Sequence, residues 1–416
     1  MFDDMKSPLQ REAERIENAV ADLFSVHSVT LGTPEDREVI RLRGTLQVPS
    51  DRAYPKIAER LRELDYTATL RRDPELELDE LLAVPGALPQ EEPSRLWVPA
   101  LLFGATVLTT LYAGAAMSDA RPPDDLWWPV LNFWQGWPFA LALLSILVAH
   151  ELGHYVVGRF HRVPRSLPYF IPLPLPEFMN IFGTLGAVIF MKGRITNRRV
   201  MLDIGAAGPI VGVIVAIPVL LLGLSLSEVQ PVTTDQIYML EGNSLLYLLL
   251  KYAMFGRWLP GGGLDVFIHP VAFAGWAGLL VTAFNLIPAG QLDGGHILYS
   301  LLGDRAQRLT WPIIVALAAL GLLGWPGWFL WAGLVYLFGR GHPGVLDTIT
   351  QLDTRRKIVA VLVLAVLVLT FTPIPLTIVV PEGVQGESVQ AVVLLAGVLT
   401  GLGWLARRWE ARRHHG

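Results

Sequence analysis

The sequence predicts a polytopic α-helical integral membrane protein of about eight spans, preceded by a small soluble α+β domain. Of its 416 residues, 52% are hydrophobic and only 17% are charged, against roughly 25% charged in an ordinary soluble domain. The charged residues concentrate before residue 95, and Leu, Ala, Val and Gly concentrate after it. The net charge of −4 indicates little by itself. No basic, aromatic-interleaved stretch points to nucleic acid as a partner.

Residues 1–75 are predicted to form a soluble cytoplasmic α+β domain. Met1 to Glu17 carries many charges and no apolar stretch, so we do not expect a signal peptide. Periodicity predicts helix, strand, helix and strand in turn, over 10–24, 38–48, 54–64 and 66–72. The following stretch 76–95 is acidic and then proline-rich, which is typical of a linker.

From Trp97 onward, long apolar segments alternate with short polar loops. A membrane-spanning helix needs about 20 apolar residues, and the candidate spans are 96–117, 138–160, 201–226, 268–289, 309–324, 326–340, 357–380 and 388–406. The fifth and sixth are short, and they fit either two spans or one tight hairpin. We therefore assign 96–406 to a transmembrane domain and 407–416 to a basic cytoplasmic tail.

The charges of the loops predict how the spans are oriented. An eight-span chain with a cytoplasmic amino terminus places most loop arginines and lysines inside, and its outer loops carry mainly acidic residues. This is the distribution that the positive-inside rule requires. We expect a multi-pass protein of the cell membrane with both termini in the cytoplasm. Lys251 and Arg257 are the main exceptions, and they flank 244–258, which we interpret as an interfacial or re-entrant helix.

A metal-binding pattern lies at the end of the second candidate span. His150, Glu151 and His154 form an H-E-L-G-H run. Two histidines four residues apart lie on one face of a helix, so both imidazoles can reach one Zn²⁺, with Glu151 beside it as a general base. The chain has no cysteine, so a metal must be bound by histidine and carboxylate.

A third metal ligand is expected from a later span. Residues 285–296 read N-L-I-P-A-G-Q-L-D-G-G-H, and Pro288 interrupts any helix that contains it. Broken backbone at membrane depth is tolerated only where protein buries it or a watery cavity solvates it. Asp293, inside this stretch, can supply a carboxylate oxygen. The result is a two-histidine, one-carboxylate site for one Zn²⁺ per chain, with a fourth position open to water.

Several of these residues also have a structural interpretation. The two histidines could be satisfied inside a helical bundle, Asp293 could cap a helix, and Asn285 could be an amide that packs between helices. Asp203 either caps the third span or orients a zinc-bound imidazole. Structural roles are also expected of Gly208, Gly212, His269 and His296.

The two motifs together resemble the site-2 protease family of intramembrane zinc metalloproteases. H-E-x-x-H precedes N-x-x-P-x-x-x-L-D-G within a core of about 138–300. The wider sequence is similar to the group that lacks a PDZ domain and includes plant chloroplast and cyanobacterial members. Residues 227–267 are too few to hold the PDZ domain of many bacterial relatives, and no nucleotide-sensing module follows the membrane part. The amino-terminal domain is then the candidate for binding a regulatory partner.

This resemblance implies a zinc metalloendopeptidase that cleaves transmembrane segments of single-span membrane proteins within the bilayer, in regulated intramembrane proteolysis. It implies that His150, His154 and Asp293 bind zinc and that Glu151 transfers the proton. Asn285 then hydrogen-bonds the substrate carbonyl or the developing oxyanion.

Two further points stay open in the sequence. Residues 183–191 are β-prone and either hold an unwound substrate by strand addition or form a loop that packs on the core. The alternatives to a protease are a transporter or metal-ion carrier lined by intramembrane histidine and aspartate, and a catalytically silent scaffold of the same fold.

Overall fold

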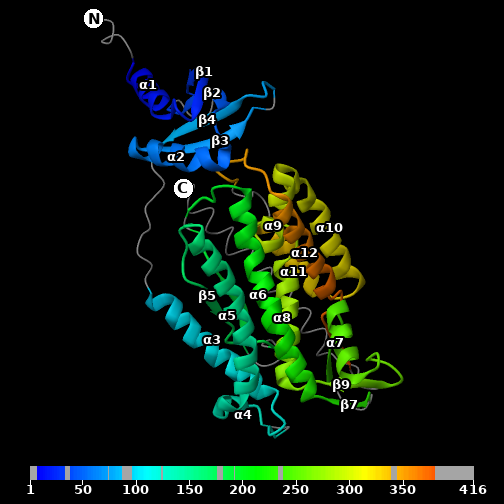
Figure 1. Ribbon diagram of the computed structural model, residues 1–416. Helices are drawn as coiled ribbons and strands as arrows, with labels where there is room; N and C mark the ends of the chain where they lie inside the picture. Colours follow the sequence, from blue (N-terminus) through cyan, green and yellow to red (C-terminus); the bar gives the residue numbers. More distant parts are fainter. Residues whose placement is uncertain are drawn as a thin grey trace, which may run out of the picture.

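The chain folds into a small α/β domain set against one end of an elongated helical bundle (Figure 1). This computed structural model describes residues 7–32, 38–73, 75–86, 96–122, 125–175, 181–191, 193–232, 238–338 and 344–379. The predicted span 388–406, the predicted tail 407–416 and the end of the predicted linker, 87–95, lie outside the described residues.

The amino-terminal domain is a four-stranded antiparallel sheet in the order β1-β2-β4-β3. Its elements are α1 Pro8–Val20, β1 Phe24–Leu31, β2 Ile40–Leu46, α2 Ser50–Glu63, β3 Tyr66–Arg72 and β4 Asp79–Pro85. Ile16 of α1 and Ile57 of α2 are fully buried in one cluster with Leu42 and Leu81 of the sheet. Burial of these apolar positions holds the helices on the sheet.

The sheet extends beyond the predicted domain boundary at residue 75. β4 lies within the predicted linker 76–95, yet it pairs with both β2 and β3 in the interior of the sheet. The sequence did not predict this strand, because its neighbours are acidic and it has few buried apolar positions, chiefly Leu81 and Ala83. β1 is likewise not predicted, because most of its residues are exposed.

Four helical segments of the described chain are long and apolar enough to cross a membrane: Trp97–Ala116, Phe133–Phe160, Arg198–Ser225 and Asp293–Leu323. They contain α3 Trp97–Ala116, η2 Phe133–Gly136, α5 Trp137–Phe160, α6 Arg198–Ser225, α9 Asp293–Leu302, η4 Gly303–Leu309 and α10 Thr310–Leu323. The shorter helices are α4 Trp128–Leu131, α7 Leu245–Phe255, α8 Pro270–Asn285, α11 Gly327–Phe338 and α12 Thr354–Thr370. The chain is therefore a helical membrane protein.

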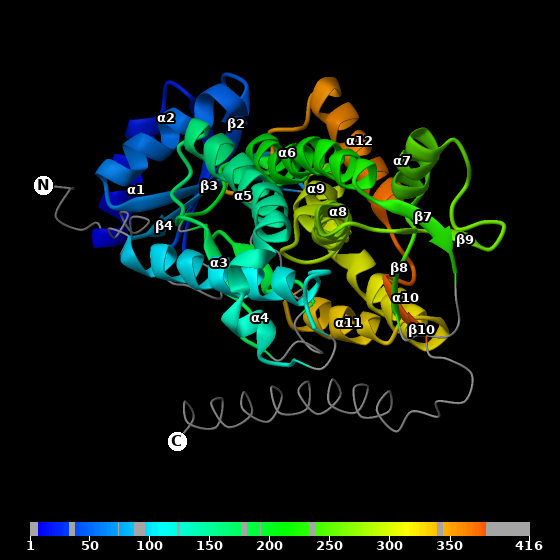
Figure 2. The same cartoon turned by 90° about the horizontal axis from the view of Figure 1, so that it is seen from below.

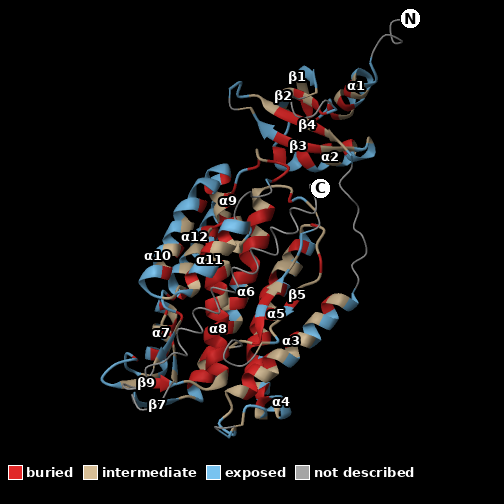
Figure 3. Cartoon of the chain, turned by 180° about the vertical axis from the view of Figure 1, so that it is seen from behind, coloured by how far each residue is buried: buried red, intermediate tan, exposed pale blue. Residues whose placement is uncertain are grey.

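The outer surface of the bundle carries exposed apolar side chains. Leu322 and Leu323 of α10 are 79% and 86% exposed, and Val361 and Leu362 of α12 are each 60% exposed. In Figure 3 these outer helices are largely exposed, whereas α8 and the inner sides of α5 and α6 are buried. A large apolar surface is unfavourable in contact with water but favourable in contact with lipid tails. The exposed side chains therefore agree with a helical bundle that lies in a bilayer.

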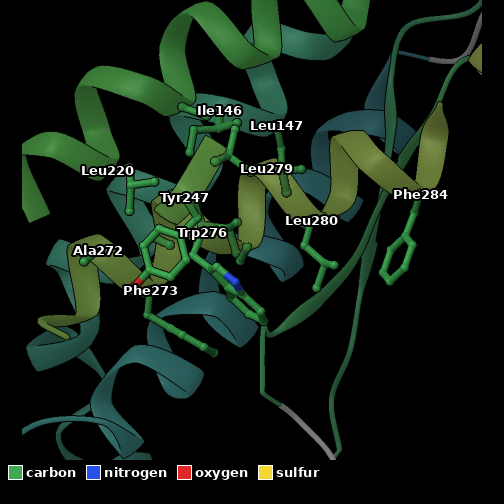
Figure 4. Close-up of a cluster of buried hydrophobic side chains, with 14 of the residues drawn as sticks. Ile146, Leu147, Leu220, Tyr247, Ala272, Phe273, Trp276, Leu279, Leu280 and Phe284 are labelled. Atoms are coloured by element: carbon green, nitrogen blue, oxygen red, sulfur yellow. The ribbon is translucent and has the colours of Figure 1, made fainter. Parts of the chain in front are cut away.

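The centre of the bundle is α8, of whose 16 residues 13 are buried. Viewed from below, α5, α6, α10 and α12 surround it (Figure 2). Trp276 and Leu279 of α8 pack beside Ile146 of α5 and Leu220 of α6 (Figure 4). A helix that is apolar on all sides is stable where neighbours cover every side, which is the position that α8 takes.

The fourth and fifth predicted spans are divided differently from the prediction. Pro288 has no amide to donate and disturbs a helix, and α8 ends just before it, at Asn285. Helix resumes at Asp293 and continues to Leu323. The predicted span 309–324 is thus the second half of a longer helical segment.

The seventh predicted span is shorter than expected, and the described part of the sixth is short. α11 has 12 residues, a length of about 18 Å at 1.5 Å per residue. It folds back on α10 as a hairpin, with the rings of Trp311 and Tyr336 6.0 Å apart. α12 ends at Thr370, and β10 (Leu376–Val379) occupies the end of the predicted span 357–380.

Two β-ribbons and α7 form the end of the molecule opposite the amino-terminal domain (Figure 1). β7 (Glu228–Pro231) pairs with β9 (Leu264–Phe267), and β8 (Tyr238–Glu241) pairs with β10. Lys251 of α7 is fully buried here, with its Nζ 3.4 Å from Asp265 Oδ1 and 4.7 Å from the Tyr247 ring centroid. This internal ion pair explains why Lys251 departs from the charge pattern predicted for the outer loops.

The segment before α12 joins the amino-terminal domain to the bundle. Leu346 is 4% exposed and belongs to the hydrophobic core of that domain. The Leu70 amide of β3 donates to the Leu346 carbonyl at 2.7 Å, and the Asp347 amide donates to the Thr196 carbonyl at 2.7 Å. One short segment therefore bridges the edge of the sheet and the residues that precede α6.

Candidate metal centre

The structure brings the three predicted ligands together inside the bundle. His150 and His154 lie one turn apart on α5, and Asp293 is the first residue of α9. His150 Nε2 and His154 Nε2 are 3.2 Å apart, and each lies 3.3 Å from Asp293 Oδ2. Among the described residues, these three form the group of histidine and carboxylate atoms that could hold a metal.

The spacing of these atoms fits a tetrahedral zinc ion. A zinc ion with bonds of about 2.0–2.1 Å at tetrahedral angles separates its ligand atoms by about 3.3 Å. The three observed separations are 3.2, 3.3 and 3.3 Å. Two imidazoles and one carboxylate are also ligands that zinc prefers, and they leave a fourth position open. The donor set therefore fits the ion predicted from the sequence.

The break between α8 and α9 places Asp293 at the level of the histidines. α8 ends at Asn285, and the chain turns through Gly290, whose φ of +61° is a conformation that favours glycine. Asp293 then stands in the first turn of α9, where a negative charge is stabilised by the helix dipole. The proline and glycines of this stretch thus position a carboxylate rather than merely ending a span.

A backbone carbonyl orients one of the ligands. His154 Nδ1 donates to the carbonyl oxygen of Ile204 on α6 at 2.8 Å. With its proton on Nδ1, the ring presents the free electron pair of Nε2 toward Asp293, which is the usual arrangement behind metal-bound histidines. Sequence analysis did not find Ile204, because an apolar side chain carries no sign of what its carbonyl binds.

α6 approaches the ligands closely because it carries glycines where it passes them. A Cβ on Gly208 would lie 2.1 Å from His154 Nε2, and a Cβ on Gly212 would lie 3.1 Å from His150 Nδ1. The expected close packing at these two glycines is therefore packing against the imidazole rings themselves.

Asp203 neither caps α6 nor hydrogen-bonds one of the predicted metal-binding histidines directly. The cap of α6 is Asn197, whose side chain accepts from the amides of Arg199 and Val200. Asp203 instead accepts two hydrogen bonds from Arg356, at 2.8 and 2.7 Å, and lies 3.0 Å from His161 Nε2. Both partners were outside the predicted site. Arg356 lies 153 residues away along the chain, so no local pattern indicates the contact.

The other two predicted site residues lie beside the ligands. Glu151 is 7% exposed and stands outside the three-residue metal group, and Asn285 Nδ2 is 3.4 Å from His150 Nε2. Both line a cavity of about 160 Å³ that also contains the ligands. The cavity is also lined by further residues, among them Arg165, Ala187, Met191, Gln291 and His296.

Part of the predicted β-prone segment is a strand at this cavity. β6 (Thr184–Val188) pairs with β5 (Tyr169–Pro172), and residues 187–189 line the cavity. His269, at a distance from it, caps α8 by accepting from the Val271 amide at 3.2 Å. His296 lies on the cavity wall but outside the metal group.

Comparison with known proteins agrees with the geometry. The family model described as Peptidase family M50 matches residues 138–321. The chain is 29% identical over 369 residues to the probable zinc metalloprotease EGY1, chloroplastic, of Oryza sativa subsp. japonica, covering 80% of this chain and 62% of the relative. It is 32% identical over 308 residues to EGY1 of Arabidopsis thaliana, covering 68% and 54%.

A third relative, the probable zinc metalloprotease EGY2, chloroplastic, of Arabidopsis thaliana, is 29% identical over 366 residues, covering 85% of this chain and 63% of the relative. The chain thus spans 54 to 63% of the length of these three relatives. The matched family region contains both histidines and Asp293. With both motifs in order and their ligands within reach of one ion, the chain belongs to peptidase family M50, the site-2 protease family.

Proposed function

We propose that this chain is an intramembrane zinc metalloendopeptidase that cuts transmembrane segments of single-span membrane proteins near the cytoplasmic side. The observation that carries the proposal is the triangle of His150, His154 and Asp293, whose three atoms lie 3.2 to 3.3 Å apart. One Zn²⁺ per chain matches that single triangle among the described residues. An intact Glu151 beside it supports a catalyst over a silent scaffold.

The residues around the ligands fit peptide hydrolysis. When bound, zinc supplies Lewis-acid activation of water and of the scissile carbonyl. Glu151 accepts the proton of the attacking water and then delivers it to the leaving amine as the C–N bond breaks. Asn285 donates a hydrogen bond to the carbonyl oxygen as that oxygen gains negative charge.

The substrate helix has to unwind before its carbonyls can react, because a helix engages them in its own hydrogen bonds. We propose that β6 holds the unwound peptide by adding it as a strand. The position of residues 187–189 on the cavity wall supports this role.

We further propose eight membrane crossings in the cell membrane, with both termini cytoplasmic. The proposal is supported by the arginine-rich loops and by apolar helices over seven of the eight predicted segments. We also propose that a regulatory partner binds the amino-terminal domain. The contact of this domain with the residues that precede α6 supports that role. Reporter fusions at Gly416 and near Gln385 test the topology, since they should report opposite sides of the membrane.

The variant Glu151→Gln tests the catalytic proposal. Glutamine preserves size and hydrogen bonding but cannot accept the proton, so zinc content should persist while cleavage of a single-span substrate falls about 10²–10⁴-fold. Glu241→Gln is the matched control, because Glu241 is also a buried glutamate but lies in β8. Zinc and cleavage are measured on the same detergent-purified preparations. Near-normal cleavage by Glu151→Gln would refute the proposed mechanism.

The substrates can be sought in the same way. Single-span proteins that accumulate in membranes of cells with the Glu151→Gln variant, relative to cells with the active chain, are the expected substrates.

A further inference from the structure

Asp203 of α6 joins this helix to α12 and to the end of α5. It lies on α6 and accepts from Arg356 of α12 through both carboxylate oxygens, at 2.8 and 2.7 Å. His161, the residue that ends α5, lies 3.0 Å away on the same carboxylate. A two-point contact between guanidinium and carboxylate fixes orientation as well as distance. The start of α6 is therefore held in a defined position relative to α5 and α12.

The residue after Asp203 is the one that contacts the metal ligand. The Ile204 carbonyl accepts from His154 Nδ1 at 2.8 Å. His154 lies on α5 and Ile204 on α6, so the hydrogen bond depends on how these two helices are placed. Asp203, one residue away along α6, holds both the end of α5 and the start of α12.

Arg356 is itself held from two sides. Asp353 caps α12 by accepting from the Arg356 amide at 2.9 Å, and it accepts from the Arg356 guanidinium at 2.6 Å. The chain just before Asp353 carries Leu346, which is buried in the core of the amino-terminal domain. The Arg356 guanidinium, which donates to Asp203, is thus connected through the start of α12 to the amino-terminal domain.

We propose that Asp203 and Arg356 are a positioning pair for the metal ligand His154, acting through the Ile204 carbonyl. The inference rests on the proposed zinc site and adds two residues to it. Their role is to keep α6 where its carbonyl fixes the His154 ring, so their loss weakens metal binding while the fold remains. Asp203 and Arg356 side chains are 22% and 32% exposed, and ion pairs so exposed contribute little to stability.

The chain offers a matched control on the same face. Asp51 of α2 accepts from Arg199 Nη1 at 2.9 Å, and their side chains are 37% and 31% exposed. Arg199 lies in the first turn of α6, and its ion pair joins that turn to α2 of the amino-terminal domain rather than to α5. If the variants act by loosening the start of α6 in general, loss of either ion pair should weaken zinc binding. If Asp203 has a positioning role, only loss of the Asp203–Arg356 pair should do so.

The test is zinc affinity of the detergent-purified full chain, measured by competition with a chromophoric chelator. Asp203→Asn and Arg356→Gln should each weaken zinc binding about tenfold, the lower end of the range for residues behind metal ligands. The double variant should be no weaker than either single variant, because both break one contact. Arg356→Lys should not restore affinity, because lysine lacks the two-point fork. Asp51→Asn should bind zinc as the wild type does.

The outcomes separate this inference from the proposed function. A wild-type chain without a tight zinc site would refute the proposed function and this inference with it. Wild-type affinity in Asp203→Asn and Arg356→Gln, with zinc bound normally by the unmodified chain, would overturn the positioning pair alone. Equal weakening by Asp51→Asn would also overturn it, in favour of general loosening. If Asp203→Asn fails to fold, Arg356→Gln and Arg356→Lys test the same contact by changing its other partner.

Discussion

His154 Nδ1 lies 2.8 Å from the carbonyl oxygen of Ile204, and this contact turns Nε2 of the same ring toward Asp293 Oδ2, 3.3 Å away. A proposed metal ligand on one helix is thereby oriented by the backbone of another. The relationship explains why α6 lies so close to α5 at this level.

Removing one ligand should remove the metal. Asp293→Ala leaves only the two imidazoles of the three-residue group, and two ligands hold zinc far more weakly than three. We expect the variant to lose most of its zinc, measured by elemental analysis after dialysis against a weak chelator. His296→Ala is the control, because His296 lines the same cavity outside the group. Full zinc retention by Asp293→Ala would exclude the carboxylate as a ligand.

Enlarging Gly208 should displace His154. A Cβ at this position would lie 2.1 Å from His154 Nε2, far inside van der Waals contact, and overpacking typically costs about 1–3 kcal/mol. We expect Gly208→Ala to lose zinc affinity and proteolytic activity together. Gly104→Ala is the control, since a Cβ there meets nothing within 4 Å. Equal zinc affinity in both variants would show that the ring tolerates the added methyl group.

The ribbon of β8 and β10, which contains Glu241, should lose stability as pH rises toward neutrality. Burial raises the pKa of Glu241 from 4.5 to about 7, although the Lys251 ammonium and the Tyr247 hydroxyl both favour its charged form. Because the folded pKa is the higher one, the contribution of this group to stability is full below about pH 4.5 and is lost as pH rises through about 7.

Thermal unfolding of the full chain followed by tryptophan fluorescence measures this effect. The Tm of the wild type should fall between about pH 4.5 and about pH 7, whereas Glu241→Gln, which keeps the neutral form, should have a flatter profile. Asp265, which also faces this cluster, remains in both proteins. Identical pH profiles would show that Glu241 does not titrate in this range.

Truncating Leu346 should release the amino-terminal domain from the bundle. Leu346 is 4% exposed within the core of that domain, and leucine-to-alanine changes in cores cost about 2–5 kcal/mol. We expect faster hydrogen exchange in β3, whose Leu70 amide donates to the Leu346 carbonyl. Leu76→Ala is the control, because Leu76 is 54% exposed in the same domain. Unchanged exchange in Leu346→Ala would mean that backbone pairing alone holds the domain.

Local spacing in the sequence determined the placement of two of the three proposed metal ligands. His150 and His154 share a helix face because helical periodicity brings residues four apart together, and this holds wherever the helix lies. Asp293 was predicted from the proline-broken stretch around Pro288, since a disturbed backbone within an apolar segment has to be buried by protein or solvated by a cavity. Asn285 was predicted only through the resemblance to a known family. The overall helical membrane character followed from composition. All of these depend on residues near one another in the chain.

Only the tertiary structure decided how those ligands are supported. The Ile204 carbonyl, the contact of Asp203 with Arg356 and the burial of Lys251 against Asp265 all join separate elements. A backbone carbonyl carries no mark in the sequence, and a single charged residue does not reveal its distant partner. The strand β4 was hidden for a related reason, because its pairing with β2 and β3 outweighs a composition typical of a linker. Periodicity reports local geometry, whereas these contacts are settled by packing across the fold.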